Sequence, residues 1–349
     1  MPIQVIDPYG VTADRELATL PLALDPAVVK SEFKRGLPLL AGPDGRVRPK
    51  AIRVVRYRPG KRCLIEYDVR VERPDVQREK RILMGKLRAR QFGSSDFRLL
   101  LSLRDAGFDS KTLDGICVPR PVGVLPRFRM WLQCKVPGDV ASDLLATPAG
   151  VGLARRIAEA AHKLHEADVP TAKRHTMSDE LRILEACLRR VAQSEPRWSQ
   201  RLERVLGACQ RLAANVPQLA PCGSHRDFYA DQVIVSGPRL YLLDFDLYCR
   251  ADPGLDIGNF LGHVTEQSLR TRGNPEALSD VEQALEERFV ELSGERVRPA
   301  VRAYTLLTLA RHIYLSTRFP ERSRWTESLL ELCEQRLGAT ARTTPHGPR

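Results

Sequence analysis

The chain lacks the long apolar run that a membrane-spanning helix needs. None of its hydrophobic stretches approaches the roughly 20 residues required to cross a bilayer. Its first ten residues, MPIQVIDPYG, also lack the basic region followed by an apolar one that marks a secretory signal. We therefore expect a protein that has no membrane partner and works in the cytoplasm.

The chain also lacks the cysteine patterns of a metal or disulfide scaffold. It holds 8 cysteines, with no C-x-x-C pair and no cysteine–histidine cluster at zinc spacing. Several of them fall on apolar helix faces, where a thiol acts as a small hydrophobic group. We expect reduced cysteines that pack in the interior.

Clusters of basic residues are missing too, although the net charge is +12. No run of five basic residues occurs, and basic residues do not alternate with aromatic ones. The excess charge can serve solubility, attraction of anionic ligands such as ATP, or nucleic-acid binding, and the last has no motif to support it. The charge also argues against a polycationic acceptor such as an aminoglycoside, which would favour an acidic pocket.

What the chain does have is the make-up of an ordinary globular protein. Its 349 residues are 43% hydrophobic and 28% charged, which is enough for two domains or one large bilobal domain. It contains no internal repeat and no low-complexity domain. The most informative part is a single stretch near the middle of the second half.

That stretch, residues 223–263, reads GSHRDFYADQVIVSGPRLYLLDFDLYCRADPGLDIGNFLGH. An apolar run at 233–235 is followed by a turn at 236–238 and a second apolar run at 240–243. The pattern predicts a two-stranded hairpin. Because a hairpin returns the chain to its starting end, the acidic loops before and after it should meet.

Four side chains with oxygen ligands should converge there: Asp227, Gln232, Asp244 and Asp246. Carboxylates held close together repel one another unless a cation lies among them. Hard oxygen ligands with few fixed positions suit Mg²⁺ that also binds phosphates. The sequence therefore predicts a phosphoryl-transfer site.

The two loops resemble the catalytic and metal loops of the kinase superfamily, where H-R-D-x-x-x-x-N is followed after a short hairpin by D-F-G. Here residues 225–227 read HRD, Gln232 takes the place of the Asn, and residues 244–246 read DFD. Together with DPGLD at 252–256, the stretch is most similar to the aminoglycoside phosphotransferase and choline kinase family of small-molecule kinases.

The resemblance implies an α+β, bilobal protein-kinase-like fold, with a five-stranded antiparallel sheet in a small N-lobe and a mainly helical C-lobe. Only seven residues separate Asp244 from Asp252, which leaves no room for the activation segment of a protein kinase. The expected parts are an N-terminal extension at 1–50, the N-lobe at 51–132, a hinge at 133–138, the C-lobe at 139–338 and a flexible tail at 339–349. The five strand-like segments are 51–58, 63–71, 80–87, 118–126 and 128–136.

The resemblance also implies which residues bind the nucleotide. The turn with Gly60 and Lys61 would cover the phosphates, and Lys86 would contact the α and β phosphates. The helix that follows lacks the Glu that pairs with this lysine in the family, so Asp96 is the candidate replacement. Each assignment has an ordinary alternative. The Gly60 turn can be a plain hairpin turn, Lys86 can extend from a strand edge to solvent, and Asp96 can simply complement the helix dipole.

The hinge would hydrogen-bond the adenine of ATP, with Gln133 and Lys135 as the contacting residues. The alternative is an ordinary edge strand that leads into a turn. The two interpretations differ only in whether a ligand binds there.

Asp227 is the expected catalytic base, which accepts the proton of a small hydroxylated acceptor molecule. Gln232, Asp244 and Asp246 would hold Mg²⁺. Arg226 belongs to the catalytic loop, where the family more usually has glycine, and we expect it to pair with a carboxylate such as Asp246. Gln232, the missing helix Glu and the sparse phosphate loop support a second hypothesis, a catalytically weak or inactive nucleotide-binding module.

Overall fold

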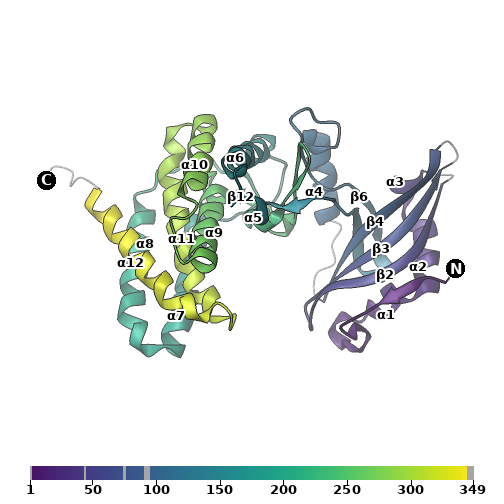
Figure 1. Ribbon diagram of the computed structural model, residues 1–349, viewed down its shortest axis with the longest axis horizontal. Coiled ribbons are helices and arrows are strands. Elements are labelled where there is room, and N and C mark those ends of the chain that lie inside the picture. Colours follow the sequence, from purple (N-terminus) through teal and green to yellow (C-terminus); the bar gives the residue numbers. More distant parts are fainter. Residues whose placement is uncertain (1, 43–44, 74–75, 90–94, 344–349) are drawn as a thin grey trace. The chain divides into compact units, whose positions relative to one another are not determined.

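The computed structural model describes residues 2–42, 45–73, 76–89 and 95–343. The chain divides into two compact units, and each unit is discontinuous in sequence. The first consists of residues 1–138 and 236–243, and the second of residues 139–235 and 244–349. The expected α+β protein-kinase-like fold, with a sheet followed by a mainly helical region, is confirmed (Figure 1).

The first unit is built on a six-stranded sheet. Its order is β1–β2–β3–β4–β7–β6, and the five strands from β2 to β6 pair antiparallel with one another. The five expected strands are therefore present, and β1 adds a sixth, which is parallel to β2. The bounds are β1 Gln4–Ile6, β2 Arg46–Arg58, β3 Arg62–Arg73, β4 Val76–Arg88, β6 Pro121–Leu125 and β7 Met130–Cys134.

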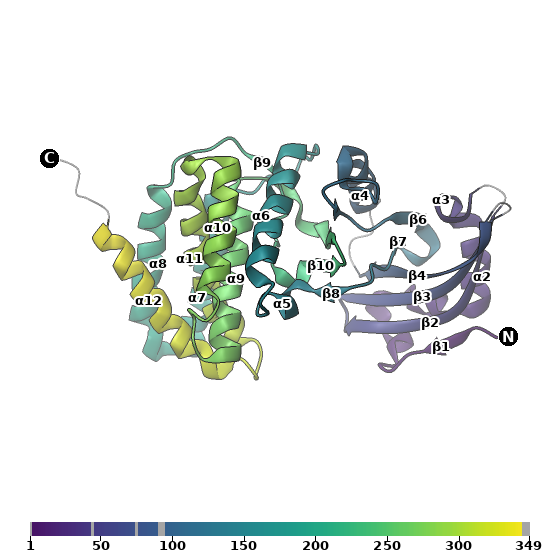
Figure 2. The same cartoon turned by 45° about the horizontal axis from the view of Figure 1, so that its top comes forward.

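Alternation along the strands decides which sheet face is covered. In β3, every second side chain from Cys63 to Val71 is buried, which is the period of a strand with one face in a core. The covering elements are α1 Leu20–Leu24, α2 Pro26–Gly36 and α3 Pro38–Ala41, which share one hydrophobic core with the strands (Figure 2). The segment expected as an N-terminal extension thus lies within the first unit.

Two residues determine where α2 begins. Asp25 is the N-cap, and its side chain accepts hydrogen bonds from the amides of Ala27 and Val28. Pro26 takes the first helical position, where its missing N–H costs nothing. Farther along the unit lie α4 Ser95–Leu103 and β5 Ile116–Cys117.

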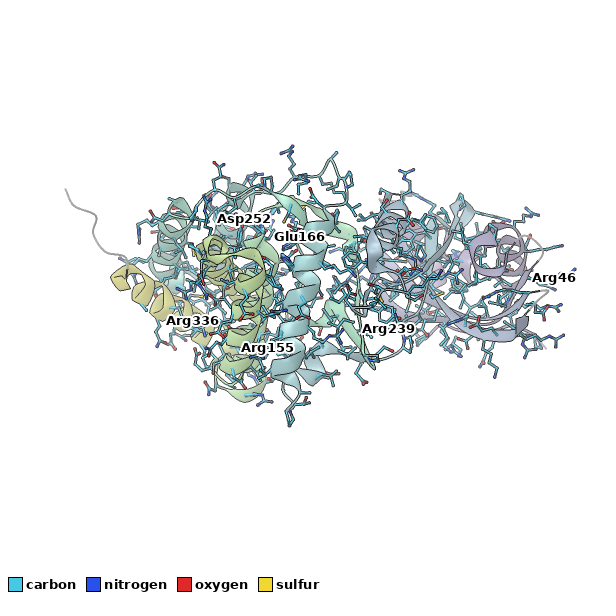
Figure 3. All side chains as sticks on the ribbon, turned by 90° about the horizontal axis from the view of Figure 1, so that it is seen from above. Arg46, Arg155, Glu166, Arg239, Asp252 and Arg336 are labelled. Atoms are coloured by element: carbon cyan, nitrogen blue, oxygen red, sulfur yellow. The ribbon has the colours of Figure 1, made fainter. Side chains whose placement is uncertain are left out.

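The second unit is mainly helical. It contains the short helix α5 Ala141–Leu144, and α9 and α11 lie side by side along most of their length (Figure 1). Arg336 on α12 is labelled in Figure 3. Its guanidinium donates to Thr265 on α9 at 3.2 Å and pairs with Glu276 at 2.6 Å. The longer helices are α6 Gly150–Ala167, α7 Met177–Ser194, α8 Ser199–Ala214, α9 Gly254–Arg272, α10 Ser279–Ser293, α11 Arg298–Thr317 and α12 Thr326–Thr343.

The predicted hairpin is present as β10 Val233–Ser236 and β11 Arg239–Leu242. These strands are neighbours in a small sheet of order β5–β11–β10–β8, in which β8 is Asp139–Val140. Gly237 in the turn has φ +56°, a left-handed conformation that glycine adopts without strain. Two further short strands, β9 Cys222–Ser224 and β12 Cys249–Ala251, pair antiparallel.

In the described part of the chain, no helix is long and apolar enough to cross a membrane. The last part of the expected tail, residues 344–349, lies outside the described residues.

Candidate active site

The loop that carries Asp227 is fixed from below by Asp256, in the first turn of α9. The Asp256 side chain is fully buried and accepts hydrogen bonds from the amides of His225 at 2.8 Å and Arg226 at 2.7 Å. His165 Nε2 of α6 lies 2.9 Å from the same carboxylate. Three groups thus hold one carboxylate, and two of them are the residues just before Asp227.

Asn259, one helical turn after Asp256, holds the other side of the loop. Its amide nitrogen donates to the carbonyl of Phe228 at 3.0 Å, and its oxygen accepts from Arg311 at 2.9 Å. The backbone is therefore anchored immediately before and immediately after Asp227, which is itself half-buried. Such anchoring gives a side chain a fixed position without surrounding it with protein.

Two residues of the site have a left-handed backbone. Arg226 has φ +69° and Asp244 has φ +56°. Residues other than glycine reach this region only at a cost of about 1 kcal/mol or more, and such strain is concentrated at functional sites. The strain falls directly beside Asp227 in one loop and on the first residue of the other.

Tyr229 reports the electrostatics around both loops. Burial raises the pKa of its hydroxyl, and the charges of Asp227, Asp231 and Asp244 raise this pKa further. Because carboxylates from both loops act on one hydroxyl, the two loops come together at Tyr229. The full convergence of the four side chains at the end of the hairpin stays a prediction.

Gln232 lies at the same place. It is almost completely buried, and its amide nitrogen donates to the Tyr229 hydroxyl at 3.3 Å. With its nitrogen so engaged, the amide oxygen is the atom that remains for a cation.

In the second loop, the backbone carbonyl of Asp246 accepts a hydrogen bond from Lys173 at 3.1 Å.

Among the described residues, no three His, Cys, Asp or Glu side chains form a group that could hold a metal ion by themselves. Magnesium usually takes one or two carboxylates and completes its coordination with phosphate oxygens and water. Two carboxylates and an amide oxygen have the right donor chemistry for that mode. The ligand set Gln232, Asp244 and Asp246 stays a prediction.

The expected pairing of Arg226 with Asp246 also stays a prediction. The positive charges of Arg311 and Arg226 instead act on the carboxylate of Glu180 in α7 and lower its pKa. Burial alone would raise the pKa of Glu180, but the hydrogen bond from His175 and these positive charges lower it below its usual value. Glu180 is therefore an ionised, buried neighbour of the catalytic loop that the sequence did not indicate.

In the first unit, Lys86 lies on β4 opposite Leu64 of β3 and is half-buried. Asp96 lies in the first turn of α4. A pairing of Asp96 with Lys86 stays a prediction.

The hinge residues have definite partners. Gln133 is the register partner of Met84 on β4, and the amide of Lys135 donates to the carbonyl of Ile82 at 2.8 Å. The Lys135 ammonium lies 2.6 Å from the carboxylate of Glu66, a largely buried residue of β3. The sequence offered no signal for this pair, because β3 also contains Asp68 and Glu72.

The turn at Gly60 is also engaged. Its amide donates to the carboxylate of Asp14 at 2.8 Å, and the amide of Lys61 donates to the carbonyl of Arg58 at 3.0 Å. Asp14 is 46 residues earlier in the chain, so no local pattern could have indicated this contact.

A model of known protein families described as the phosphotransferase enzyme family matches residues 76–304. The chain belongs to this phosphotransferase family. No curated protein gives a significant match. The match includes Lys86, the hinge and both loops of the candidate site, whereas the Gly60 turn and Asp14 precede it.

Solved structures of phosphotransferases have the same fold. A choline/ethanolamine kinase family protein from Mesorhizobium loti is 14% identical, with a TM-score of 0.56 over 88% of this chain and 93% of that one. A glucosamine kinase is also 14% identical, with a TM-score of 0.53 over 74% and 75% of the two chains. A thermostable mutant of the aminoglycoside phosphotransferase APH(4)-Ia is 15% identical, with a TM-score of 0.53 over 86% and 97%.

Proposed function

We propose that this phosphotransferase transfers the γ-phosphate of ATP to a hydroxyl group of a small molecule. The observation that carries the proposal is the anchoring of the loop around Asp227, by Asp256 on one side and Asn259 on the other. Family membership supports the reaction class. A relative of the same fold was solved as a ternary complex with AMP-PNP and hygromycin B, which supports a nucleotide and a hydroxylated acceptor as the two substrates.

In the proposed reaction, Asp227 accepts the proton of the acceptor hydroxyl. The hydroxyl oxygen attacks the γ-phosphorus in line, the bond to the β–γ bridging oxygen breaks, and ADP leaves. Lys86 binds the α and β phosphates, and Gln232, Asp244 and Asp246 hold Mg²⁺. When bound, Mg²⁺ neutralises the phosphate oxygens.

The test is ATP consumption against a panel of hydroxylated molecules. Because the relatives' names include choline, ethanolamine, glucosamine and hygromycin B, amino alcohols, amino sugars and aminoglycosides belong in the panel. Neutral and acidic sugars belong there as well, because a net charge of +12 disfavours polycationic acceptors. The panel identifies the acceptor by turnover.

Two variants test the roles of the loops. We expect Asp227→Ala to lower kcat by about 10²- to 10⁴-fold with folding intact, because the general base is lost. We expect Asp244→Ala to lose Mg-ATP binding in calorimetry. Asp231→Ala is the matched control, since Asp231 is an exposed acid of the same loop. Normal turnover in Asp227→Ala would refute the assignment.

A nucleotide-binding module without turnover is the second candidate. It is favoured by the contact between Asp14 and Gly60, which occupies an amide of the expected phosphate loop. Thermal stabilisation by Mg-ATP reports binding in either case, because a ligand that binds the folded state must stabilise it by mass action. Stabilisation without turnover on any acceptor would support the module.

A further inference from the structure

The carboxylate of Asp14 links the start of the chain to the turn between β2 and β3. One of its oxygens accepts hydrogen bonds from the Gly60 amide and the Tyr57 hydroxyl, both at 2.8 Å. The other accepts from the amides of Glu16 at 2.9 Å and Leu17 at 3.3 Å. One side chain therefore fixes a short helical turn, residues 15–17, against the tip of the hairpin.

This arrangement occupies the backbone amides that the turn could otherwise offer to a phosphate. The Gly60 and Lys61 amides are both used within the protein, and Gly60 has φ +64°. The side chains of Arg58 and Lys61 are exposed.

Glu16 adds a second negative charge at the same place. Its side chain is exposed, and its Cγ lies 3.7 Å from the position that a Cβ on Gly60 would take. Asp14 is ionised at neutral pH: burial would raise its pKa, but the hydrogen bonds from Gly60, Tyr57 and the two amides outweigh burial and lower it. Two carboxylates thus lie at the tip of the β2–β3 hairpin.

We infer that Asp14 and Glu16 lower the affinity of this protein for the triphosphate of its nucleotide, and so set the working concentration of Mg-ATP. The inference rests on the proposed function and on the expectation that the turn with Gly60 and Lys61 covers the phosphates of the bound nucleotide. Like charges a few ångströms apart repel, and near a protein surface one unit charge changes binding about three- to tenfold at such distances. The base and ribose carry no charge, so their binding is unaffected.

The experiment compares two ligands on the full-length protein. Dissociation constants for Mg-ATP and for adenosine are measured by calorimetry in the wild type, Glu16→Gln, Asp14→Asn and Asp14→Glu. Glu16→Gln removes a charge on an exposed side chain and leaves the hydrogen bonds of Asp14 in place. Asp25→Asn is the matched control, because Asp25 caps α2 with the same pattern of amide contacts.

We expect Glu16→Gln and Asp14→Asn to bind Mg-ATP about three- to tenfold more tightly and adenosine unchanged, with a smaller gain at high salt. Asp14→Glu, which keeps the charge, and Asp25→Asn should match the wild type. The inference is overturned if Glu16→Gln binds Mg-ATP no more tightly than the wild type, or if both ligands shift by the same factor. A wild type that binds no Mg-ATP would instead remove the proposed function, and the inference with it.

Discussion

Asp256 keeps its charge although it is fully buried. Burial by itself raises the pKa of a carboxyl group, but the hydrogen bond and charge of His165, with the charge and amide of His225, lower the pKa of Asp256 below its usual value. On His165, burial acts to lower the pKa, but interactions with Cys222 and Asp256 outweigh burial and raise it to about 10. The two residues therefore form a buried ion pair directly under the catalytic loop.

This ion pair predicts how stability depends on pH. A histidine whose folded pKa is raised stabilises the protein fully below its unfolded pKa of about 6.5, and this contribution disappears as the pH rises toward the folded value. We therefore expect the difference in unfolding free energy between the wild type and His165→Gln to shrink from pH 6 to pH 10. Urea denaturation at several pH values measures it.

His162→Gln serves as the control on the same helix. Burial lowers the pKa of His162 below the usual value, so it is already neutral above pH 7 and its contribution should stay constant there. If the difference in unfolding free energy between the wild type and His165→Gln also stayed constant with pH, His165 would not be charged in the folded protein. The pH dependence for Asp256 has the opposite sign. Its contribution to the unfolding free energy is present above its unfolded pKa of about 3.9 and is lost in acid.

At the residue scale, the sequence predicted the chemistry of the site but not the support that Asn259 gives to the loop. Asp227 and Asp244 were found because the two loops lie close together along the chain on either side of a hairpin. The left-handed backbone of Arg226 was not predictable, since arginine has no preference for it. The contact of Asp14 with Gly60 depends on tertiary packing, which no local pattern encodes.

At the scale of elements, α9 is the helix that organises the site, since it carries both Asp256 and Asn259. Gly254, Gly258 and Gly262 recur every four residues on its face toward α11. A Cβ at Gly258 would lie 2.4 Å from the Cβ of Tyr304, so the two helices approach each other too closely for any larger residue. This close packing fixes the depth at which α9 presents its polar side chains to the loop.

A pair of glycine-to-alanine substitutions tests this packing. We expect Gly258→Ala to destabilise the protein by about 1–3 kcal/mol, because the added methyl group forces the helices apart, and to lower kcat as the catalytic loop shifts. Gly152 of α6 has open space around it, so Gly152→Ala should stabilise by about 0.5–1 kcal/mol. Chemical denaturation measures both, and equal effects would contradict the close contact.

The strands could be predicted and this helix could not. Apolar segments between turns placed all five strands of the expected sheet, and β3 and β7 show the alternation of a strand with one buried face. The start of α9 is rich in glycine, which disfavours a helix by local propensity, and the close packing on α11 compensates for that.

At the scale of the whole molecule, the first 41 residues complete the first unit. Phe33 of α2 is 1% exposed and meets the Tyr67 ring of β3 edge-on, with ring centroids 5.0 Å apart. We expect Phe33→Ala to cost about 3–5 kcal/mol of stability, as for other large core residues. Leu39→Ala, at a position 49% exposed, should change stability by less than about 0.5 kcal/mol.

Thermal and urea unfolding of the two variants checks this. If Phe33→Ala were as stable as the wild type, the N-terminal helices would be a separable appendage. The sequence of α2 shows that one of its faces is apolar but not which surface that face covers.

The division of the chain also has a consequence for synthesis on the ribosome. Residues 1–138 emerge first, yet β11, which pairs with β5, is made only after most of the catalytic loop. Residues 1–138 can therefore begin to fold early, but β11 joins them late. By then about half of the helical region has already left the exit tunnel. A gene split at codon 139 would separate β5 from that strand, so the two fragments would have to be produced together to reassemble.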